Sequence, residues 1–399
     1  MFRVFRAFVC LVAIPAAASA QALSQRGFLE GSVFAFPQEA SNDPTRIVGD
    51  FLARDELFWT PRSWLQLAGG LDFRANTHDQ VDDSWALDFS DRTVQRPRLS
   101  VRRAAATLSH GPLSVDVGKQ FIRWGRTDVL TPTDRFAPRD FMNVFDNDLL
   151  AVTGIRGTIQ TSAGTLDAVA TRFTPARVPL VDQRWTVLPT GIAPPATPLP
   201  RLFPDSPQVG VRWNHTGAID WSAAYFDGNN YLPNIQPLAL TFPSMRMAGG
   251  DVAVPTRWVT VKGEAAYFAS SSPATDEYVM YVVQLERQTG EWVFVGGYAG
   301  EAVTNRRSTA PVTFAPDRGL TGSLVARAAY TIDVDRSFAL EGAVRIDGGG
   351  AYVRAEFSRA YGQHWRATVS GVAIGGQSSD FIGQYNRNSH ATAALRYSF

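Results

Sequence analysis

Short segments in which apolar and polar residues alternate dominate this sequence of 399 residues. The alternation is clearest at the C-terminal end, where one face carries Ser389, Ala391, Ala393, Leu395, Tyr397 and Phe399. Similar alternation recurs in 65–74, 219–225, 323–332 and 338–346. Because successive side chains of a strand point to opposite faces, this pattern predicts β-strands throughout. No uninterrupted apolar stretch of eighteen or more residues follows the N-terminus, which excludes a bundle of membrane-spanning helices.

The first twenty residues have the order of a secretory signal. Arg3 and Arg6 precede an apolar run, and small residues at 18–20 end it. We expect residues 1–20 to be cleaved after export through the Sec pathway, leaving 21–399 as a single barrel domain. The only cysteine, Cys10, would leave with the signal, so the mature chain would have no disulfide and no thiolate metal ligand.

The connections between the expected strands alternate in length. Tight turns are indicated near 61–62, 110–112, 162–164, 216–217, 255–256, 289–290, 333–335 and 361–362. Longer polar or proline-rich loops occupy roughly 37–45, 77–95, 124–148, 176–206, 228–245, 270–275, 303–318, 347–349 and 377–388. This rhythm predicts an all-β, antiparallel, up-and-down transmembrane barrel of about 18 strands, with short periplasmic turns and long extracellular loops. A count of about 16 strands stays open. A soluble β-sandwich has the same period of two, and the secretory signal and the loop rhythm favour the barrel over it.

Two motifs carry a family resemblance. The ending Leu395-Arg396-Tyr397-Ser398-Phe399 resembles the C-terminal signature of Gram-negative outer-membrane β-barrels, which the barrel-assembly machinery reads through residues such as Tyr397 and Phe399. Residues 118–125, Gly-Lys-Gln-Phe-Ile-Arg-Trp-Gly, followed by Asp134 and 138–140, are similar to a strand-and-loop motif of porin-like families. The resemblance implies a porin-type barrel in the Gram-negative outer membrane, surrounded by its lipid and conducting small hydrophilic solutes. Porins are often homo-oligomers, but the sequence shows no interface.

Charge is nearly balanced, with 38 basic and 37 acidic residues, and gives no reason to expect a nucleic-acid partner. Only Lys119 and Lys262 are lysines, so arginine supplies almost all of the positive charge. A guanidinium facing hydrocarbon at mid-bilayer costs about 2–4 kcal/mol, so we place the strand arginines on the inner wall. Strand parity gives this inward set as Arg98, Arg102, Arg156, Arg212, Arg327, Arg354, Arg366 and Arg396. Inward acids accompany them: Asp72, Asp116, Asp220, Glu286, Glu341 and Glu356. The wall is then either mutually neutralised or a basic ladder that attracts anions.

The third long loop, 124–148, combines charge with aromatic residues. Its charged candidates are Asp128, Asp134, Arg139, Asp140, Asp146 and Asp148. Trp124, Phe136, Phe141 and Phe145 indicate that the loop packs onto something. General porins fold their third loop into the lumen, and the resemblance implies the same constriction here. A loop folded over the barrel mouth, or one at a subunit contact, is the alternative.

Enzyme chemistry finds little support in the sequence. The five histidines are scattered, and no metalloprotease, nucleophile-elbow or phosphate-binding motif occurs. We expect no enzyme activity and no cofactor or metal, and predict a passive outer-membrane channel for small hydrophilic, preferentially anionic, solutes. Two alternatives remain: an outer-membrane lipid-modifying hydrolase, which would need His390 beside a serine and an acid, and a non-conducting structural or adhesion barrel.

Overall fold

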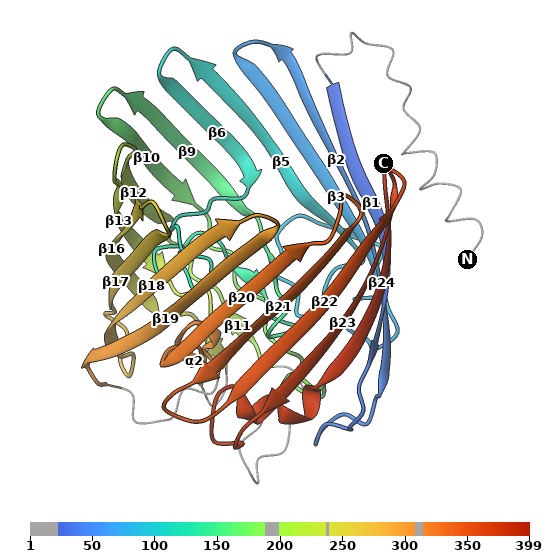
Figure 1. The fold of residues 1–399 in the computed structure, drawn as a ribbon. Coiled ribbons are helices and arrows are strands. Elements are labelled where there is room, and N and C mark those ends of the chain that lie inside the picture. Colours follow the sequence, from blue (N-terminus) through green and yellow to red (C-terminus); the bar gives the residue numbers. More distant parts are fainter. Residues whose placement is uncertain (1–22, 188–198, 237–238, 308–313) are drawn as a thin grey trace.

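A computed structural model of the protein describes residues 23–187, 199–236, 239–307 and 314–399. Within these ranges the chain forms a closed antiparallel barrel of 18 strands (Figure 1). The barrel strands are β1 (Leu23–Ala35), β2 (Ile47–Arg62), β3 (Leu65–Asn76), β5 (Leu99–His110), β6 (Leu113–Gln120), β9 (Val152–Thr161), β10 (Gly164–Thr171), β12 (Gln208–His215), β13 (Asp220–Asn229), β16 (Ser244–Pro255), β17 (Thr260–Ala269), β18 (Glu277–Thr289), β19 (Trp292–Asn305), β20 (Ser323–Thr331), β21 (Arg336–Arg345), β22 (Ala351–Tyr361), β23 (Trp365–Gly375) and β24 (His390–Ser398). The predicted fold class is confirmed. The expected signal at 1–20 lies outside the described residues.

The barrel closes where its first and last strands meet. β1 pairs with β2 on one side and with β24 on the other. Just beyond the last paired residues, the backbone groups of Gly27 and Phe399 exchange two hydrogen bonds of 3.0 Å. Closure gives each barrel strand a neighbouring strand on both sides, which is the condition for a sheet to exist in hydrocarbon.

Short and long connections alternate around the ring. The short turns span 63–64, 111–112, 162–163, 216–219, 256–259, 290–291, 332–335 and 362–364, and the long connections span 36–46, 77–98, 121–151, 172–207, 230–243, 270–276, 306–322, 346–350 and 376–389. In Figure 1 the turns between β5 and β6 and between β9 and β10 lie at the top, and α2 (Pro316–Gly319) lies toward the opposite end. The predicted strand count and loop rhythm therefore describe the structure.

The outer face of the strands is apolar and exposed. Leu108, Val117, Ile155 and Val211 are each more than 40% exposed, as expected of side chains that face lipid rather than a protein core. Trp64, Trp258, Trp292 and Trp365 are exposed next to short turns, where an interfacial aromatic girdle would lie.

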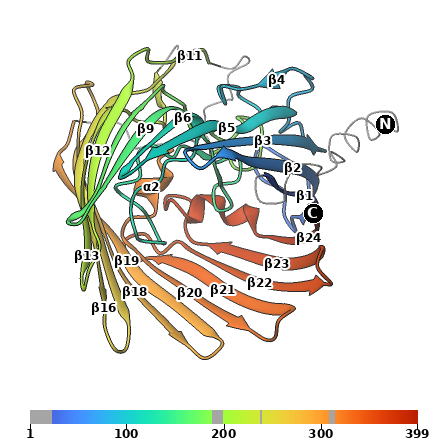
Figure 2. The same ribbon diagram turned by 90° about the horizontal axis from the view of Figure 1, so that it is seen from above.

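One half of the barrel interior is filled by an apolar core. Inward-facing Phe226, Met247, Phe268 and Met280 of β13, β16, β17 and β18 are fully buried. They form one cluster with Ile122, Trp124 and Phe136 of the 121–151 connection. Figure 2 shows this connection, coloured teal between β6 and β9, inside the ring of strands. The open part of the lumen is therefore displaced toward the opposite wall.

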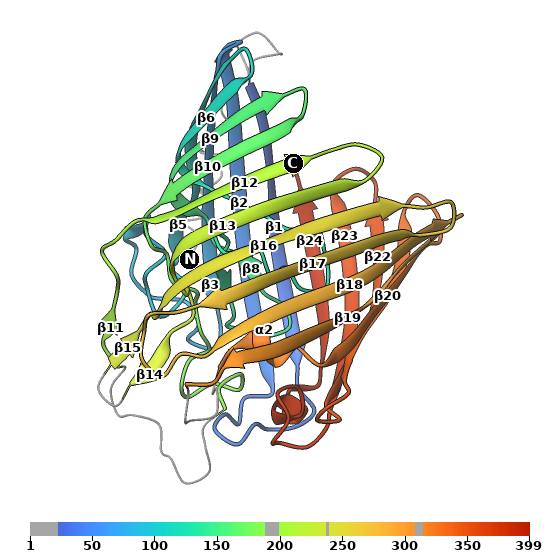
Figure 3. The same cartoon turned by 90° about the vertical axis from the view of Figure 1, so that its left-hand side faces the viewer.

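Small elements complete the loop end. β7 (Arg139–Asp140) and β8 (Asp148–Leu149) pair within the 121–151 connection, and β4 (Leu87–Asp88) adds to β5 in parallel. β11 (Arg201–Leu202), β14 (Asn234–Gln236) and β15 (Ala239–Thr241) form a separate small sheet beyond the loop ends of β12, β13 and β16 (Figure 3). η1 (Gly383–Asn388) precedes β24. Among the described helices, none is long and apolar enough to cross a bilayer.

The barrel seam provides a test of closure. A Cβ added at Gly27 would lie 2.6 Å from the Phe399 ring and 2.7 Å from the carbonyl oxygen of Arg54, whereas one added at Gly31, on the same strand, would meet nothing within 4 Å. We expect Gly27→Ala to cost about 1–3 kcal/mol through overpacking. Its thermal midpoint, measured by heat-modifiable gel migration, should fall below that of Gly31→Ala. Equal midpoints for the two variants would contradict the seam geometry.

Candidate functional site

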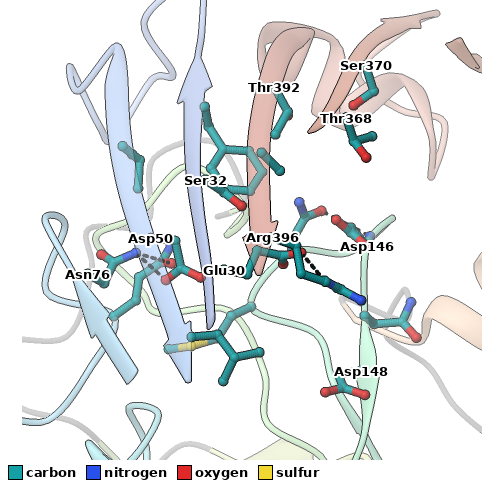
Figure 4. Close-up of a pocket in the computed structure, with 18 of the residues that line it drawn as sticks. Glu30, Ser32, Asp50, Asn76, Asp146, Asp148, Thr368, Ser370, Thr392 and Arg396 are labelled. Carbon is teal, nitrogen blue, oxygen red and sulfur yellow. Dashed lines mark hydrogen bonds and ion pairs between the residues drawn. The ribbon is translucent and has the colours of Figure 1, made fainter. Parts of the chain in front are cut away.

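A cavity of about 590 Å³ lies in the open part of the lumen. Its walls come from β1–β3 and β21–β24, and the 121–151 connection lies across from them. Seven arginines line it: Arg54, Arg74, Arg96, Arg184, Arg354, Arg366 and Arg396. Five acids line it with them: Glu30, Asp50, Asp146, Asp148 and Glu356. The cavity is thus polar and carries a small excess of positive charge (Figure 4).

Six of these seven arginines lie within 4.0 Å of a carboxylate oxygen. Arg396 Nε donates to Glu30 Oε2 at 2.7 Å across the β24–β1 seam, and Arg354 Nη2 donates to Glu356 Oε2 at 2.7 Å within β22. Such charge-assisted contacts fix the guanidinium direction, but a paired arginine attracts a solute less than a free one.

Arg366 of β23 differs from its neighbours. Its side chain is exposed to the cavity, and its Nη1 donates a hydrogen bond to Ser358 Oγ at 3.3 Å. Within the described residues it has no carboxylate within ion-pair distance. Arg366 is therefore the cavity arginine most available to an anion.

The acids opposite the wall come from the 121–151 connection. Asp148 receives hydrogen bonds from Arg54 at 2.9 Å and Arg102 at 3.3 Å, and Asp146 lies 3.9 Å from Arg354. Burial would raise the pKa of Asp148, but Arg54 and Arg102 outweigh it and hold that pKa below its ordinary value. Figure 4 shows both acids on the loop side, across from Arg396 and Glu30. Negative charge on the loop thus faces positive charge on the wall.

Glu264 of β17 anchors the start of this connection. Its buried carboxylate accepts five hydrogen bonds of 2.8–3.2 Å: from the backbone N–H groups of Arg126, Thr127 and Thr133 and from the hydroxyls of Thr127 and Thr133. Arg126 extends the anchor, because its Nε donates to Asp251 Oδ1 at 2.5 Å. Gly125 allows the backbone of the connection to lie close to Glu264. Its φ is +93°, and a Cβ there would lie 2.7 Å from the Glu264 carboxylate.

Asp140 anchors the middle of the connection. Its buried carboxylate accepts two hydrogen bonds from Arg96, at 2.8 and 3.1 Å, and one from Arg177 at 2.8 Å. Burial alone would raise the pKa of Asp140, but the charges of Arg96 and Arg177 hold it far below its ordinary value. The loops at 77–98, 121–151 and 172–207 are thereby joined through one carboxylate.

The predicted inward arginines do not form one ladder. Arg354, Arg366 and Arg396 line the cavity, and Arg102 reaches its edge through Asp148. Arg156 is paired with Asp167, Arg212 with Asp251, and the largely exposed Arg327 lies 3.9 Å from Glu341. The parity assignment of Arg98 to the inner wall is wrong. It precedes β5 rather than lying in it, pairs with Asp83, and its guanidinium lies over Trp85, away from the cavity.

The predicted loop residues also separate into groups. Only Asp146 and Asp148 line the cavity. Asp128 contacts Lys262 and Gln284 on the far wall, and Arg139 donates to Asn147 within the connection. Asp134 and Asp140 are buried in loop packing and do not line this cavity.

Sequence reasoning missed five arginines that lie in or beside this cavity: Arg54, Arg74, Arg96, Arg103 and Arg184. Arg54 and Arg74 share the inward parity of Asp72, a signal that could have found them. Arg96 and Arg184 lie in loops, where parity has no meaning. Arg103 follows a bulge: Gly70 pairs with Arg103 and Leu71 with Val101, so Arg102 and Arg103 both lie over Phe121.

The surroundings of His390 do not form the catalytic arrangement that the hydrolase alternative requires. Its Nδ1 contacts the Asn388 carbonyl oxygen at 2.8 Å, and its ring packs against Phe36 and Trp185. In the part of the chain that the structure describes, no serine hydroxyl bonds to this ring, and no three acidic, histidine or cysteine side chains gather as a metal site.

Solved structures share this fold at low sequence identity. A BenF-like porin from Pseudomonas fluorescens Pf-5 has a TM-score of 0.57 and 11% identity, covering 95% of this chain and 98% of that one. OccK3 (OpdO) of Pseudomonas aeruginosa gives 0.54 and 11%, covering 94% and 96%. OccAB4 of Acinetobacter baumannii gives 0.52 and 11%, covering 96% and 100%. No protein-family model matches the sequence, and no curated protein matches it significantly. The fold is that of a porin-type barrel.

The Glu264 anchor can be tested by Glu264→Gln. The amide nitrogen cannot accept hydrogen bonds. Since Oε1 accepts two of the five contacts and Oε2 accepts three, two or three contacts should be lost. Hydrogen bonds to a charged group are worth about 1.5–3 kcal/mol each, so we expect the free energy of unfolding to fall by about 3 kcal/mol or more. Glu286→Gln, at a half-buried ion pair with Lys262, is the matched control. Similar thermal midpoints for the two variants would show that Glu264 is not the anchor.

Asp134 makes stability depend on pH. Burial raises its pKa to about 6 from 3.8, against the opposing hydrogen bond from the Trp124 backbone N–H and the charge of Arg123. The folded state therefore holds this proton more tightly than the unfolded state. Its contribution is fully present below about pH 3.8 and is lost as pH rises through about 6. We expect Asp134→Asn to remove this part of the pH dependence of the thermal midpoint between pH 4 and 7. An unchanged pH profile would contradict the assignment.

Proposed function

We propose that this protein is an outer-membrane channel of a Gram-negative cell through which small hydrophilic solutes diffuse, with a preference for anions. The observation that carries the proposal is the 590 Å³ lumen cavity, in which the exposed guanidinium of Arg366 has no carboxylate partner among the described residues. Similarity of fold to the solved porins supports the channel role.

The cavity has dimensions suited to small solutes. Pockets that hold small organic molecules measure about 300–1,000 Å³, so this space accommodates a small solute but not a folded protein or polymer coil. Paired and unpaired arginines along one wall would offer an anion several weak contacts in succession. Weak binding at several sites is what conduction needs, because a solute must leave as readily as it enters.

The two acids of the 121–151 connection that line the cavity would influence which solutes pass. Asp146 and Asp148 face the wall arginines, so a solute between them would experience a transverse field. Such a field favours polar solutes that can align their dipoles and disfavours apolar ones. The 121–151 connection would thus act as a constriction loop.

Biogenesis completes the proposal. Residues 1–20 would direct export through the Sec pathway, and the barrel-assembly machinery would recognise Tyr397 and Phe399. Outer-membrane lipid would surround the apolar belt. Self-association into a homo-oligomer stays a prediction from the resemblance.

Planar-bilayer recording tests the preference. Arg366→Gln removes a charge. Because Ser358 is the only described residue to which the Arg366 side chain hydrogen-bonds, folding should be retained. One unit charge at about 4 Å in a water-like medium is worth about 1 kcal/mol, so we expect the anion-to-cation permeability ratio in a KCl gradient to fall by about fivefold. Arg327→Gln, an inward and exposed arginine outside the cavity, should change the ratio much less.

Two results would count against the proposal. A barrel that shows folded gel migration but no conductance steps would overturn the channel role. Conduction with a cation preference, unchanged by Arg366→Gln, would overturn only the anion preference.

A further inference from the structure

A second feature lies on the outer surface of the barrel, near its loop end. β6 ends at Gln120, so part of the β5 edge has no barrel strand beside it. β4, from the 77–98 connection, pairs in parallel with Leu99–Ser100 of β5 in that place. A loop therefore completes the wall here.

This loop carries an exposed apolar row. Trp85, Leu87 and Phe89 alternate along the chain and are 52%, 58% and 46% exposed. The Trp85 ring stacks on Phe73 of β3 at 6.1 Å and 26°. Phe73 has the parity of exposed Leu71, which faces outward. The row therefore extends the apolar outer face of the barrel toward its loop end.

Three arginines gather beside this row. The guanidinium groups of Arg92 and Arg201 lie over the Phe203 ring at 4.9 and 5.3 Å, and Arg201 also donates to the backbone carbonyl of Arg92. Arg172 is exposed and directly follows β10. Arg92 Nη2 donates to the backbone carbonyl oxygen of Phe173, the residue after Arg172, at 2.8 Å, which places Arg172 beside Arg92.

This cationic cluster has no ion pair. Among the described residues, no carboxylate lies within 4.0 Å of the guanidinium nitrogens of Arg92, Arg172 or Arg201, although the charge of Asp205 reaches Arg92. By contrast, Arg246, an outward arginine at the loop end of β16, is paired with Asp227 at 3.3 Å. Clustered cations repel one another, so an anion supplied from outside would stabilise the group.

The position of the cluster indicates where that anion would come from. Val209 is an exposed outward residue near the loop end of β12, paired in register with Ala170 of β10. Arg172 stands two residues beyond Ala170, with the same parity. The cluster therefore sits at the loop-end rim of the exposed apolar face, where the headgroups of a surrounding lipid layer would lie.

We propose that Arg92, Arg172 and Arg201 bind the phosphorylated headgroup of an anionic membrane lipid, with its acyl chains along Trp85, Leu87 and Phe89. Guanidinium groups suit phosphate because their planar N–H donors match its oxygens. Clusters of basic residues beside an apolar membrane surface are the ordinary form of anionic-lipid recognition.

Native mass spectrometry of the full barrel in detergent micelles tests the site, with dioleoyl phosphatidic acid and dioleoyl phosphatidylcholine as probes. The wild type should retain the phosphatidic acid preferentially. An arginine near an anionic headgroup contributes about 1 kcal/mol, so Arg172→Gln and Arg201→Gln should each weaken retention by about fivefold. Arg246→Gln is the matched control and should have no effect.

The design separates folding from binding. Arg201 contacts the backbone of its own cluster, so Arg201→Gln also perturbs the loop. The Arg172 side chain makes no hydrogen bond or ion pair within the described part of the chain, so its replacement should leave the fold intact. Equal retention of the two lipids, or an equal loss in Arg246→Gln, would overturn the proposal. So would inorganic phosphate alone, if it displaced the lipid at equal concentration, since that would indicate a site for free anions.

Discussion

Backbone hydrogen bonding is the constraint on which the rest of this structure depends. In hydrocarbon an unpaired amide or carbonyl group costs several kcal/mol, so a sheet can exist there only as a closed ring. The pairing of β1 with β24 satisfies this condition. Closure then dictates the chemistry of both faces. Outward side chains that meet hydrocarbon must be apolar, and charged strand side chains at the same depth point into the lumen.

An 18-stranded ring encloses more space than its own side chains fill, and the 121–151 connection occupies part of that space. Buried carboxylates decide where it lies. Glu264 holds one end with five hydrogen bonds, and Asp140 holds the middle through Arg96 and Arg177. A buried charge is tolerated only when several donors satisfy it, so the loop has one well-defined position. The apolar cluster around Phe226 and Met247 fills the same half of the barrel.

The cavity is the part of the lumen that the 121–151 connection and the apolar cluster do not fill. Its wall is rich in arginine because those strands face the lumen, and its loop side is acidic because Asp146 and Asp148 project from the connection. Most of the charge is internally compensated. Arg366 stands apart because its neighbour is the hydroxyl of Ser358 rather than a carboxylate. The outer cluster at Arg92, Arg172 and Arg201 resembles Arg366 in lacking a carboxylate partner among the described residues. Cations without a carboxylate partner mark a place for an external anion.

The sequence by itself determined the barrel, its strand count and its loop rhythm, because side-chain alternation and turn residues are local properties. Parity also assigned Arg354, Arg366 and Arg396 to the inner wall, since the face of a residue depends only on its position within a regular strand. Tertiary structure decided the rest. Parity fails at the bulge beside Arg103 and outside the strand at Arg98. Inward Phe226 packs against a loop, whereas inward Arg366 faces the open cavity. The alternation pattern does not distinguish these two environments, because they depend on which distant segment of the chain fills the lumen beside each residue.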